Sequence, residues 1–373
     1  MQICICRISV KIKIGDITKI RTGKLDANAA DENGQYPFFT CSKEPLKINT
    51  YSYDCECVLV AGNGDLNVKY YNGKFDAYQR TYIIEDDSVG LLFMPYLYFF
   101  MESYIDELRK QSIGGVIKYI KLKNLTDALI ELPSIEVQRK IVNIISKSKE
   151  IVRKKENEFE LLDELVRARF VEMFGDPVIN DKKWPTVSVE NLCDEIYGGG
   201  TPSKAHEEYY ENGDIPWVSS KDMKTDVVTD SQIKINQLGI ENSTARLVPV
   251  NSVIMVIRSG ILKHTLPVAI NAVPITVNQD LKVFVPGNKI TSRFLAAQFK
   301  MQEKSILFGV RAVTADNIEF NSLKARRMIV PPLELQNQIA SFVEEVDKSR
   351  SRIQKSLEAS QELFDSLMQE YFG

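Results

Sequence analysis

The chain has 373 residues, of which 44% are hydrophobic and 26% charged, and its formal net charge is −3. These values are typical of a soluble globular protein with two ordinary domains, and they argue against a protein that is basic over its whole surface. Any contact with nucleic acid would therefore depend on basic residues that are concentrated locally.

The N-terminal residues MQICICRISVKIKIG alternate apolar and polar side chains. This pattern predicts a β-strand and not the apolar core of a signal peptide. The apolar run 89–101 is too short to span a bilayer and contains Pro95. We therefore expect a cytoplasmic protein that has no contact with a membrane.

Four of the six cysteines lie in two C-x-C pairs, and the chain has only two histidines. A zinc site would need thiolates almost alone, so we expect each pair to lie on one face of a strand. A metal site or a disulfide is the less favoured alternative. The cysteines are Cys4, Cys6, Cys41, Cys55, Cys57 and Cys193.

Short alternating runs predict strands in the first third of the chain, for example CVLVAGNG (57–64), where GNG is a turn signal, and RTYIIED (80–86). The stretch KYYNGKFDAYQRTY (69–82) interleaves basic residues with tyrosines. Lysine can neutralise phosphates, and arginine and glutamine can form paired hydrogen bonds with base edges. The alternative is a β-hairpin with its turn at Asn72-Gly73, whose tyrosines cover their own sheet. The candidate DNA contacts are Lys69, Tyr70, Tyr71, Lys74, Tyr78, Gln79 and Arg80.

The phrase LPSIEVQRKI (132–141) begins a predicted helix in which apolar residues recur at alternating steps of three and four. Pro133 suits the position before a helix, and Gly175 suits the position after one. We expect about 34 residues, or roughly 50 Å. The apolar seam contains Ile141, Ile145, Val152, Phe159, Leu162, Val166 and Met173.

The second half again carries strand-like runs, namely VSVENL (187–192), VIMVIRSG (253–260) and LKVFVP (281–286). Trp184 and Trp217 are expected to be packing residues. Polar and basic residues of this half are further candidate DNA contacts. They are Lys204, Ser219, Ser220, Lys221, Arg258, Lys263, His264, Asn278 and Gln279.

The phrase VPPLELQNQI (330–339) repeats the phrase at 132–141 with an offset of 198 residues (331 minus 133). The offset holds to the end of the chain, where Phe174-Gly175 falls on Phe372-Gly373. Upstream, IGDITKIRTGK (14–24) corresponds loosely to VENLCDEIYGGG (189–200) at an offset of 175 (189 minus 14), and Gln79 corresponds to Gln279.

The repeat predicts an α+β fold with an internal pseudo-two-fold. Two β-rich domains, 1–131 and 184–329, would each be followed by a long helix, 132–175 and 330–373. A narrow apolar seam on a long helix needs a partner, so we expect the two helices to pack as an antiparallel coiled coil. The alternative is that each helix docks separately on its own domain.

Motifs of catalysis are absent from the sequence. It contains no GxxxxGK[ST] phosphate loop, and MPY (94–96) is not the Asn/Asp-Pro-Pro-aromatic loop of an amino-methyltransferase. His206 and His264 lie in no nucleophile motif, and EDD (85–87) is typical of a solvated turn. We therefore predict a chain that is not an enzyme.

Several stretches resemble one family. GGGTPSK (198–204) with GDIPWVSSKDMK (213–224) is similar to the start of a target-recognition domain in the specificity subunits of type I restriction-modification systems. RTGKLDANA (21–29), YPFFTCS (36–42) and GKFDAYQRTYII (73–84) resemble another variety of that domain, and PPLELQNQI resembles the start of the family's spacer helix. The resemblance covers essentially the whole chain. It departs at Ser134, where the family usually has a second proline, and at 114–125, an imperfect copy of 309–323.

The resemblance implies that double-stranded DNA is read as two half-sites, one per domain. It also implies that two modification subunits, which bind S-adenosylmethionine and methylate adenine, dock on the helices. Restriction subunits that use ATP and Mg are a further partner that the resemblance allows, and no cofactor is expected on this chain itself. Two rival interpretations remain, a structural scaffold without a DNA role and a fragment of a fused restriction-methylation enzyme.

Overall fold

The computed structural model describes residues 10–308, 310 and 317–373. The chain folds into two units, Met1–Asn157 with Ile353–Gly373, and Glu158–Arg352. Each unit therefore combines one β-rich domain with parts of both long helices. The end of the predicted first strand forms β1 (Val10–Lys13), whereas Cys4 and Cys6 lie outside the described residues.

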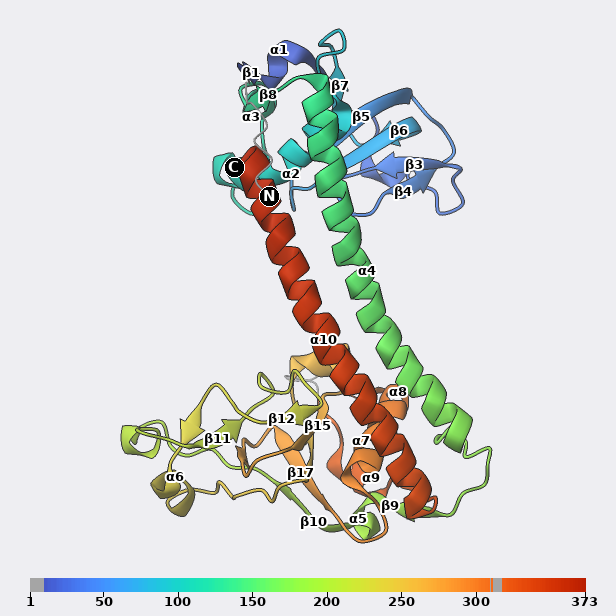
Figure 1. The fold of residues 1–373 in the computed structure, drawn as a ribbon, viewed down its shortest axis with the longest axis vertical. Coiled ribbons are helices and arrows are strands. Elements are labelled where there is room, and N and C mark those ends of the chain that lie inside the picture. Colours follow the sequence, from blue (N-terminus) through green and yellow to red (C-terminus); the bar gives the residue numbers. More distant parts are fainter. Residues whose placement is uncertain (1–9, 309, 311–316) are drawn as a thin grey trace. The chain divides into compact units, whose positions relative to one another are not determined.

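In the first unit, six strands form one sheet in the order β2-β7-β5-β6-β3-β4 (Figure 1). Alternation along β5 supplies two cores, because Cys57 and Leu59 face one side of the sheet and Val58 and Val60 face the other. Helix α2 (Met94–Gln111) covers the second side. The strands are β2 (Thr18–Thr22), β3 (Tyr36–Phe39), β4 (Leu46–Ile48), β5 (Tyr53–Ala61), β6 (Val68–Ala77) and β7 (Thr81–Asp86); the short elements are α1 (Ile14–Ile17), η1 (Ala27–Ala29), α3 (Leu122–Thr126) and β8 (Leu129–Leu132).

The sheet of the first unit curls. β2 lies at one edge of the sheet order, yet the chain just beyond it bonds to the end of β6: Lys24 N donates to Ala77 O at 3.2 Å, and Leu25 forms a parallel bridge with Tyr78. The closed side encloses a small aromatic core that includes Phe39 and Phe75. Strand ends that are distant in sequence therefore meet at one edge.

The second unit contains a five-stranded sheet, β10-β17-β14-β15-β12, and a three-stranded sheet, β13-β11-β16. Its main core joins these strands to helix α7 through Phe284, Phe294 and Phe299. Trp217 is buried and Trp184 packs against the core, as predicted. The strands are β9 (Thr186–Ser188), β10 (Cys193–Gly198), β11 (Ile215–Val218), β12 (Val227–Val228), β13 (Lys234–Ile235), β14 (Val253–Val256), β15 (Val268–Asn271), β16 (Thr276–Val277), β17 (Leu281–Pro286) and β18 (Arg327–Ile329). The helices are α5 (Val189–Leu192), η2 (Glu207–Tyr209), α6 (Gln237–Glu241), η3 (Gly260–Lys263), α7 (Ser292–Met301), α8 (Glu303–Leu307) and α9 (Phe320–Ala325).

The strand pairs that close each domain confirm the repeat residue by residue. β1 pairs with β8 so that Lys13 lies opposite Leu129, and β9 pairs with β18 so that Ser188 lies opposite Arg327. The first partners differ by 175 residues (188 minus 13) and the second by 198 (327 minus 129). Both offsets read from the sequence are therefore present in one structural feature.

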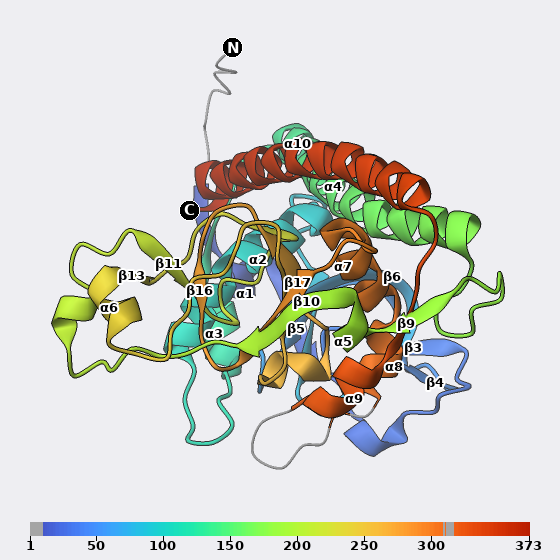
Figure 2. The ribbon, with the colours of Figure 1, turned by 90° about the horizontal axis from the view of Figure 1, so that it is seen from below.

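The two long helices are α4 (Ile135–Phe174) and α10 (Leu333–Phe372), of 40 residues each. They are longer than the expected 34 because each begins two residues after the prolines, ahead of the apolar seam. Within each unit a segment of α4 lies beside an antiparallel segment of α10 (Figures 1 and 2). The predicted seam positions on both helices are buried or half-buried. In the second unit Asp163 pairs with Arg350, and further along α4 Arg169 covers the ring of Phe342. The predicted antiparallel pairing is confirmed within each unit.

The repeated glutamine of the phrases at 132–141 and 330–339 has the same function in both units. Gln138 Oε1 accepts from Phe93 N at 2.8 Å, and Gln336 Oε1 accepts from Thr291 N at 2.9 Å. Both side chains are fully buried, and each amide nitrogen donates to two backbone carbonyls. Each glutamine thus ties the first turn of its long helix to the start of α2 or α7.

Two local predictions were wrong. Asn72-Gly73 forms no hairpin turn; both residues lie inside β6, which pairs with β5 along eight residues. Gly73 adopts φ +138°, a conformation open to glycine, so the strand continues through it. The run VSVENL is not one strand, because it changes after Ser188 from β9 to the short helix α5. The GNG turn, in contrast, lies where β5 turns back into β6, as predicted.

Candidate nucleic-acid interface

In the first domain, four strand ends meet at the loop 78–80. Tyr78 N donates to Phe39 O at 2.9 Å, and Gly62 N donates to Arg80 O at 2.8 Å. A Cβ on Gly62 would lie 2.4 Å from that carbonyl oxygen, so this close approach requires glycine. The loop is consequently held by its backbone, and its side chains are available for other contacts. We call this edge the first loop edge.

Gln79 and Arg80 are exposed at the first loop edge. The guanidinium of Arg80 has no ion-pair partner among the residues that the structure describes, and Lys24, beside it on the chain that follows β2, is also exposed. An unpaired guanidinium on a rigid loop can present two parallel donors to a guanine edge. Sequence reasoning did not select Lys24.

The remaining candidates of the first domain are largely engaged by their own sheet. Tyr71 packs against Phe39 and Phe75, and the Tyr70 hydroxyl donates to Glu56 at 2.6 Å. The tyrosines therefore cover their own sheet, as the alternative interpretation of this stretch expected, although without its hairpin turn.

The two lysines of this stretch have different surroundings. Lys74 is exposed and lies over the ring of Tyr51, 4.6 Å from its centroid. Lys69 is half-buried, and burial lowers the pKa of its ammonium group. Lys69 donates to Asn67, whose own amide donates to Cys41 O at 2.8 Å, so it lies near the first loop edge. Lys74 is therefore the better placed of the two to contact a phosphate.

The second domain builds the same edge from corresponding atoms. Asn278 N donates to Val218 O at 3.0 Å, Gly200 N to Val277 O at 3.0 Å, and Ile257 N to Asp280 O at 2.9 Å. These bonds correspond to those made by Tyr78, Leu25 and Gly62 in the first domain. Gln79 and Gln279 therefore occupy equivalent positions. We call this edge the second loop edge.

The side chains of the second loop edge are connected to one another. Asp280 Oδ1 accepts from Arg258 at 2.6 and 2.7 Å, its Oδ2 accepts from Asn278 at 3.2 Å, and Gln279 accepts from the Thr201 hydroxyl. Six of the predicted residues lie on these adjoining strand ends. They are Ser219, Ser220, Lys221, Arg258, Asn278 and Gln279.

The other three predicted residues lie in flanking loops. Lys204 is exposed after Thr201, and Lys263 and His264 lie at the end of η3. Asp280 and Thr201 were missed by sequence reasoning. The match of Gln79 with Gln279 could have found Asp280, because it places Asp280 opposite Arg80.

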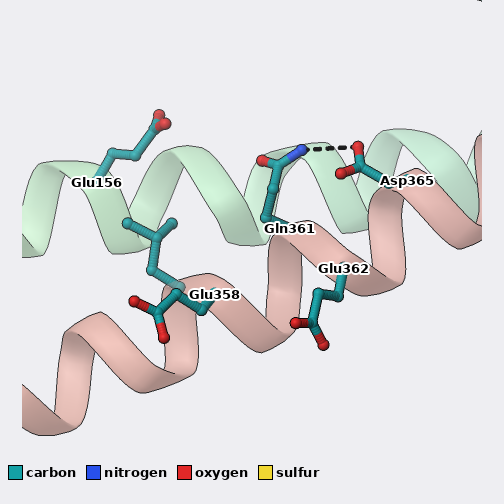
Figure 3. Close-up of a pocket in the computed structure, with 6 residues that line it drawn as sticks. Glu156, Glu358, Gln361, Glu362 and Asp365 are labelled. Carbon is teal, nitrogen blue, oxygen red and sulfur yellow. Dashed lines mark hydrogen bonds between the residues drawn. The ribbon is translucent and has the colours of Figure 1, made fainter.

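The helix pair of the first unit presents a different surface. An open depression between α4 and α10 is lined by Glu156, Glu358, Glu362 and Asp365, together with Leu357 and Gln361 (Figure 3). Gln361 donates to Asp365 at 2.9 Å, and the other carboxylates face solvent. Because four carboxylates repel phosphate, this part of the helix pair is unsuited to DNA.

The described residues offer little for catalysis. In residues 10–308, 310 and 317–373 no three histidine, cysteine or acidic side chains form a possible metal site. Burial raises the pKa of the Cys193 thiol to about 12, and Cys55 and Cys57 lie on β5 as predicted. No helix in the described part of the chain is long and apolar enough to cross a membrane.

Fold and loop edges together define a class of protein: two related β-rich domains with matching loop edges, each combined with segments of a shared pair of long helices. A family model for the type I restriction modification DNA specificity domain matches residues 9–161 and 181–361.

Three known proteins of this kind are similar to the chain. The EcoDI specificity subunit of Escherichia coli is 45% identical over 123 residues, which are 33% of this chain and 27% of that subunit. The EcoR124I/EcoR124II specificity subunit, also of Escherichia coli, is 29% identical over 292 residues, covering 74% of this chain and 69% of its own. The crystal structure of the S subunit from M. genitalium has a TM-score of 0.66 at 13% identity, over 100% of this chain and 98% of that chain.

The chain belongs to the family of type I restriction-modification DNA specificity subunits. The repeat that the sequence revealed is the family's duplicated domain, since the family model matches it twice.

Proposed function

We propose that this chain recognises a bipartite DNA target, with one half-site read by the domain 1–131 and the other by the domain 184–329. The observation that carries the proposal is that one edge of four strand ends is built twice with the same backbone bonds and different side chains. A constant frame with variable side chains is what two readers of different half-sites need.

The helices 132–175 and 330–373 would separate the readers and dock two modification subunits. Forty helical residues span about 60 Å at 1.5 Å per residue, whereas half-sites read from one face of DNA lie about 34–36 Å apart. The length is therefore sufficient. Methyl transfer with S-adenosylmethionine would belong to the modification subunits, and ATP-dependent cleavage to restriction subunits where present, so this chain itself would be non-catalytic.

Domain exchange tests the proposal. Residues 184–329 are replaced by the corresponding domain of another specificity subunit, and the chimera is expressed with its modification partner. Sequencing of methylated adenines should show a motif with one half-site changed and the other retained. The intact chain with the same partner is the control. A motif in which both half-sites change, or no methylation motif from the intact complex, would contradict the two-reader model.

A further inference from the structure

A loop between α2 and α3 exposes two apolar side chains that contact nothing in their own domain. Val116 is fully exposed and Ile117 is 63% exposed, at the tip of the loop 112–119. Figure 2 shows this teal loop projecting beyond the elements that flank it. Exposure of two neighbouring β-branched residues on a protruding tip is unfavourable in water, and such a tip is typical of a contact surface.

The tip is a built turn. Ile113 and Tyr119 exchange two backbone hydrogen bonds, of 3.0 and 2.8 Å, which close the loop at its base. Gly114 adopts φ +118°, and a Cβ there would lie 2.5 Å from Ile117 O, so only glycine allows the turn. The position of Val116 and Ile117 is therefore fixed by the backbone.

The loop is bonded directly to the first loop edge. Gly64 N donates to Lys118 O at 2.9 Å, and Ile120 N donates to Gly62 O at 2.9 Å. Gly62 in turn donates to Arg80 O. One glycine thus connects the base of the apolar tip to the loop that carries Gln79 and Arg80, so a duplex lying on the first loop edge would also meet the tip.

The charge of the segment favours a polyanion over a protein surface. Residues 109–126 contain five basic residues and no acidic one. Arg109, Lys110 and Lys123 are paired with neighbouring acids. Lys118 and Lys121, which bracket the end of the loop, have no ion-pair partner among the residues that the structure describes.

We propose that the loop 112–119 is a second DNA-contacting element of the first domain, one that rests on the proposed function. Val116 and Ile117 enter a groove of the duplex beside the bases read at the first loop edge, and Lys118 neutralises a flanking phosphate. Apolar side chains at a groove read thymine methyl groups or separate a base step, so the tip adds affinity at the target and selectivity for its sequence.

The test uses the complex of the full chain with its modification partner, and duplexes carrying the motif found by methylation mapping. Val116→Ser combined with Ile117→Ser should weaken binding to the target by about tenfold or more, and binding to scrambled duplex by much less. Val89→Ser combined with Leu91→Ser is the matched control: these residues are 100% and 60% exposed in the same unit, in the turn after the other end of β7. The control should bind as the wild type does.

A third variant separates the charge from the apolar contact. Lys118→Ala should weaken target and scrambled duplex alike and lower the salt dependence of binding by about one counterion. Binding of the Val116→Ser/Ile117→Ser variant within twofold of the wild type would overturn the proposal, as would loss of its assembly with the modification partner on gel filtration, which would make the tip a protein-docking surface. A wild-type complex that does not prefer its methylated motif over scrambled duplex would instead refute the proposed function.

Discussion

In the first unit, Lys149 of α4 donates to Glu102 of α2 at 2.9 and 3.0 Å. The equivalent positions of the second unit, 198 residues later, are Asp347 of α10 and Lys300 of α7. The two helix–domain contacts therefore carry the same pair of charges in exchanged positions. The buried glutamines of the two units, in contrast, make the same three hydrogen bonds.

This contrast separates what the fold requires from what distinguishes the copies. Backbone-directed bonds are the same in both units because they hold each long helix to its domain. The charges differ, and a helix docked on the wrong domain would bring Lys149 against Lys300, or Asp347 against Glu102. Like charges at such a contact disfavour exchange of the two helix segments.

The loop edges follow the same rule. In the second domain Arg258 is held by Asp280, and the equivalent pair of the first domain is Asn63 and Arg80, with the cation on the other strand. The backbone bond that joins the two loops is the same in both domains, Gly62 to Arg80 and Ile257 to Asp280. The frames agree and the reading side chains differ, which is the pattern that two different half-sites would select.

Truncation should break the comparison most severely. In the first unit the end of α10 packs on the domain through Phe364, Leu367 and Tyr371, and Phe372 contacts Tyr96. A chain that ends at Gly175 loses this surface, and the equivalent end of α4 from a second copy can replace it. We expect a two-fold homodimer that, with its modification partner, methylates an interrupted palindrome of the first half-site.

Sedimentation of the truncated chain and mapping of its methylation motif check the two steps separately. Lys155, which takes the place of Ile353 in the seam, would weaken the dimer, so sedimentation should be measured over a range of concentrations. A folded monomer at all of them would show that the second copy does not replace α10. An asymmetric motif would contradict the two-fold arrangement.

The buried glutamines give the next largest effect. Gln336→Ala leaves the Thr291 N–H and two carbonyl groups without their partner in a buried site, and we expect a loss of about 3 kcal/mol in the free energy of unfolding. Gln138→Ala should cost a similar amount. Gln361→Ala, at an exposed position bonded to Asp365, is the control and should have little effect. Equilibrium denaturation checks the values, and hydrogen exchange should show protection lost mainly in the unit that carries the change.

The long helices and the repeat could be predicted from the sequence because their signals are local or periodic. The three-and-four spacing selected seam positions that are buried, among them Ile141, Ile145 and Ile339. The same local reasoning failed at Asn72-Gly73, where a strong turn signal lies within a strand. Pairing with the nine-residue β5 overrides the turn signal, and this pairing depends on residues distant in sequence.

The candidate site was predictable in part for the same reason. The offset of about 200 residues placed Gln279 opposite Gln79, and both lie at the expected equivalent positions. Whether a guanidinium is free or held could not be read from the sequence. It depends on Arg258 meeting Asp280, 22 residues away, through the pairing of β14 with β17.

Substitutions at the loop edges sharpen the comparison. Arg80→Ala should cost about 1–3 kcal/mol in binding to the target and relax specificity in the first half-site only. Arg258→Ala should do so in the second half-site only. Lys74→Ala, a change at a cation outside the loop edge, should weaken target and scrambled duplex alike and reduce the salt dependence. Binding curves at two salt concentrations decide between these behaviours. Unchanged affinity of a folded Arg80→Ala complex would remove Arg80 from the reading surface.

The smallest effect concerns Asp347, the charge that replaces Lys149 in the second copy. Burial raises the pKa of this carboxyl, the charge of Asp226 raises it further, and the cations Arg350, Arg293 and Lys300 offset this only in part. The folded state therefore binds a proton at higher pH than the unfolded state does. From this group alone, stability falls as pH rises from the unfolded value near 3.8 through the raised pKa of the folded state, and it is level above that.

Asp347→Asn removes this contribution, because asparagine does not titrate. Relative to wild type, the variant should be most stable at neutral pH and should lose that relative stability as the pH is lowered toward 4, with a total change below about 1 kcal/mol. Thermal unfolding of both proteins at a series of pH values measures the difference. Asp365→Asn, at an exposed position of the same helix, should give a difference that does not vary with pH. A difference for Asp347→Asn that grows as the pH falls would mean that Arg350 and Arg293 stabilise the charged carboxylate more than burial disfavours it.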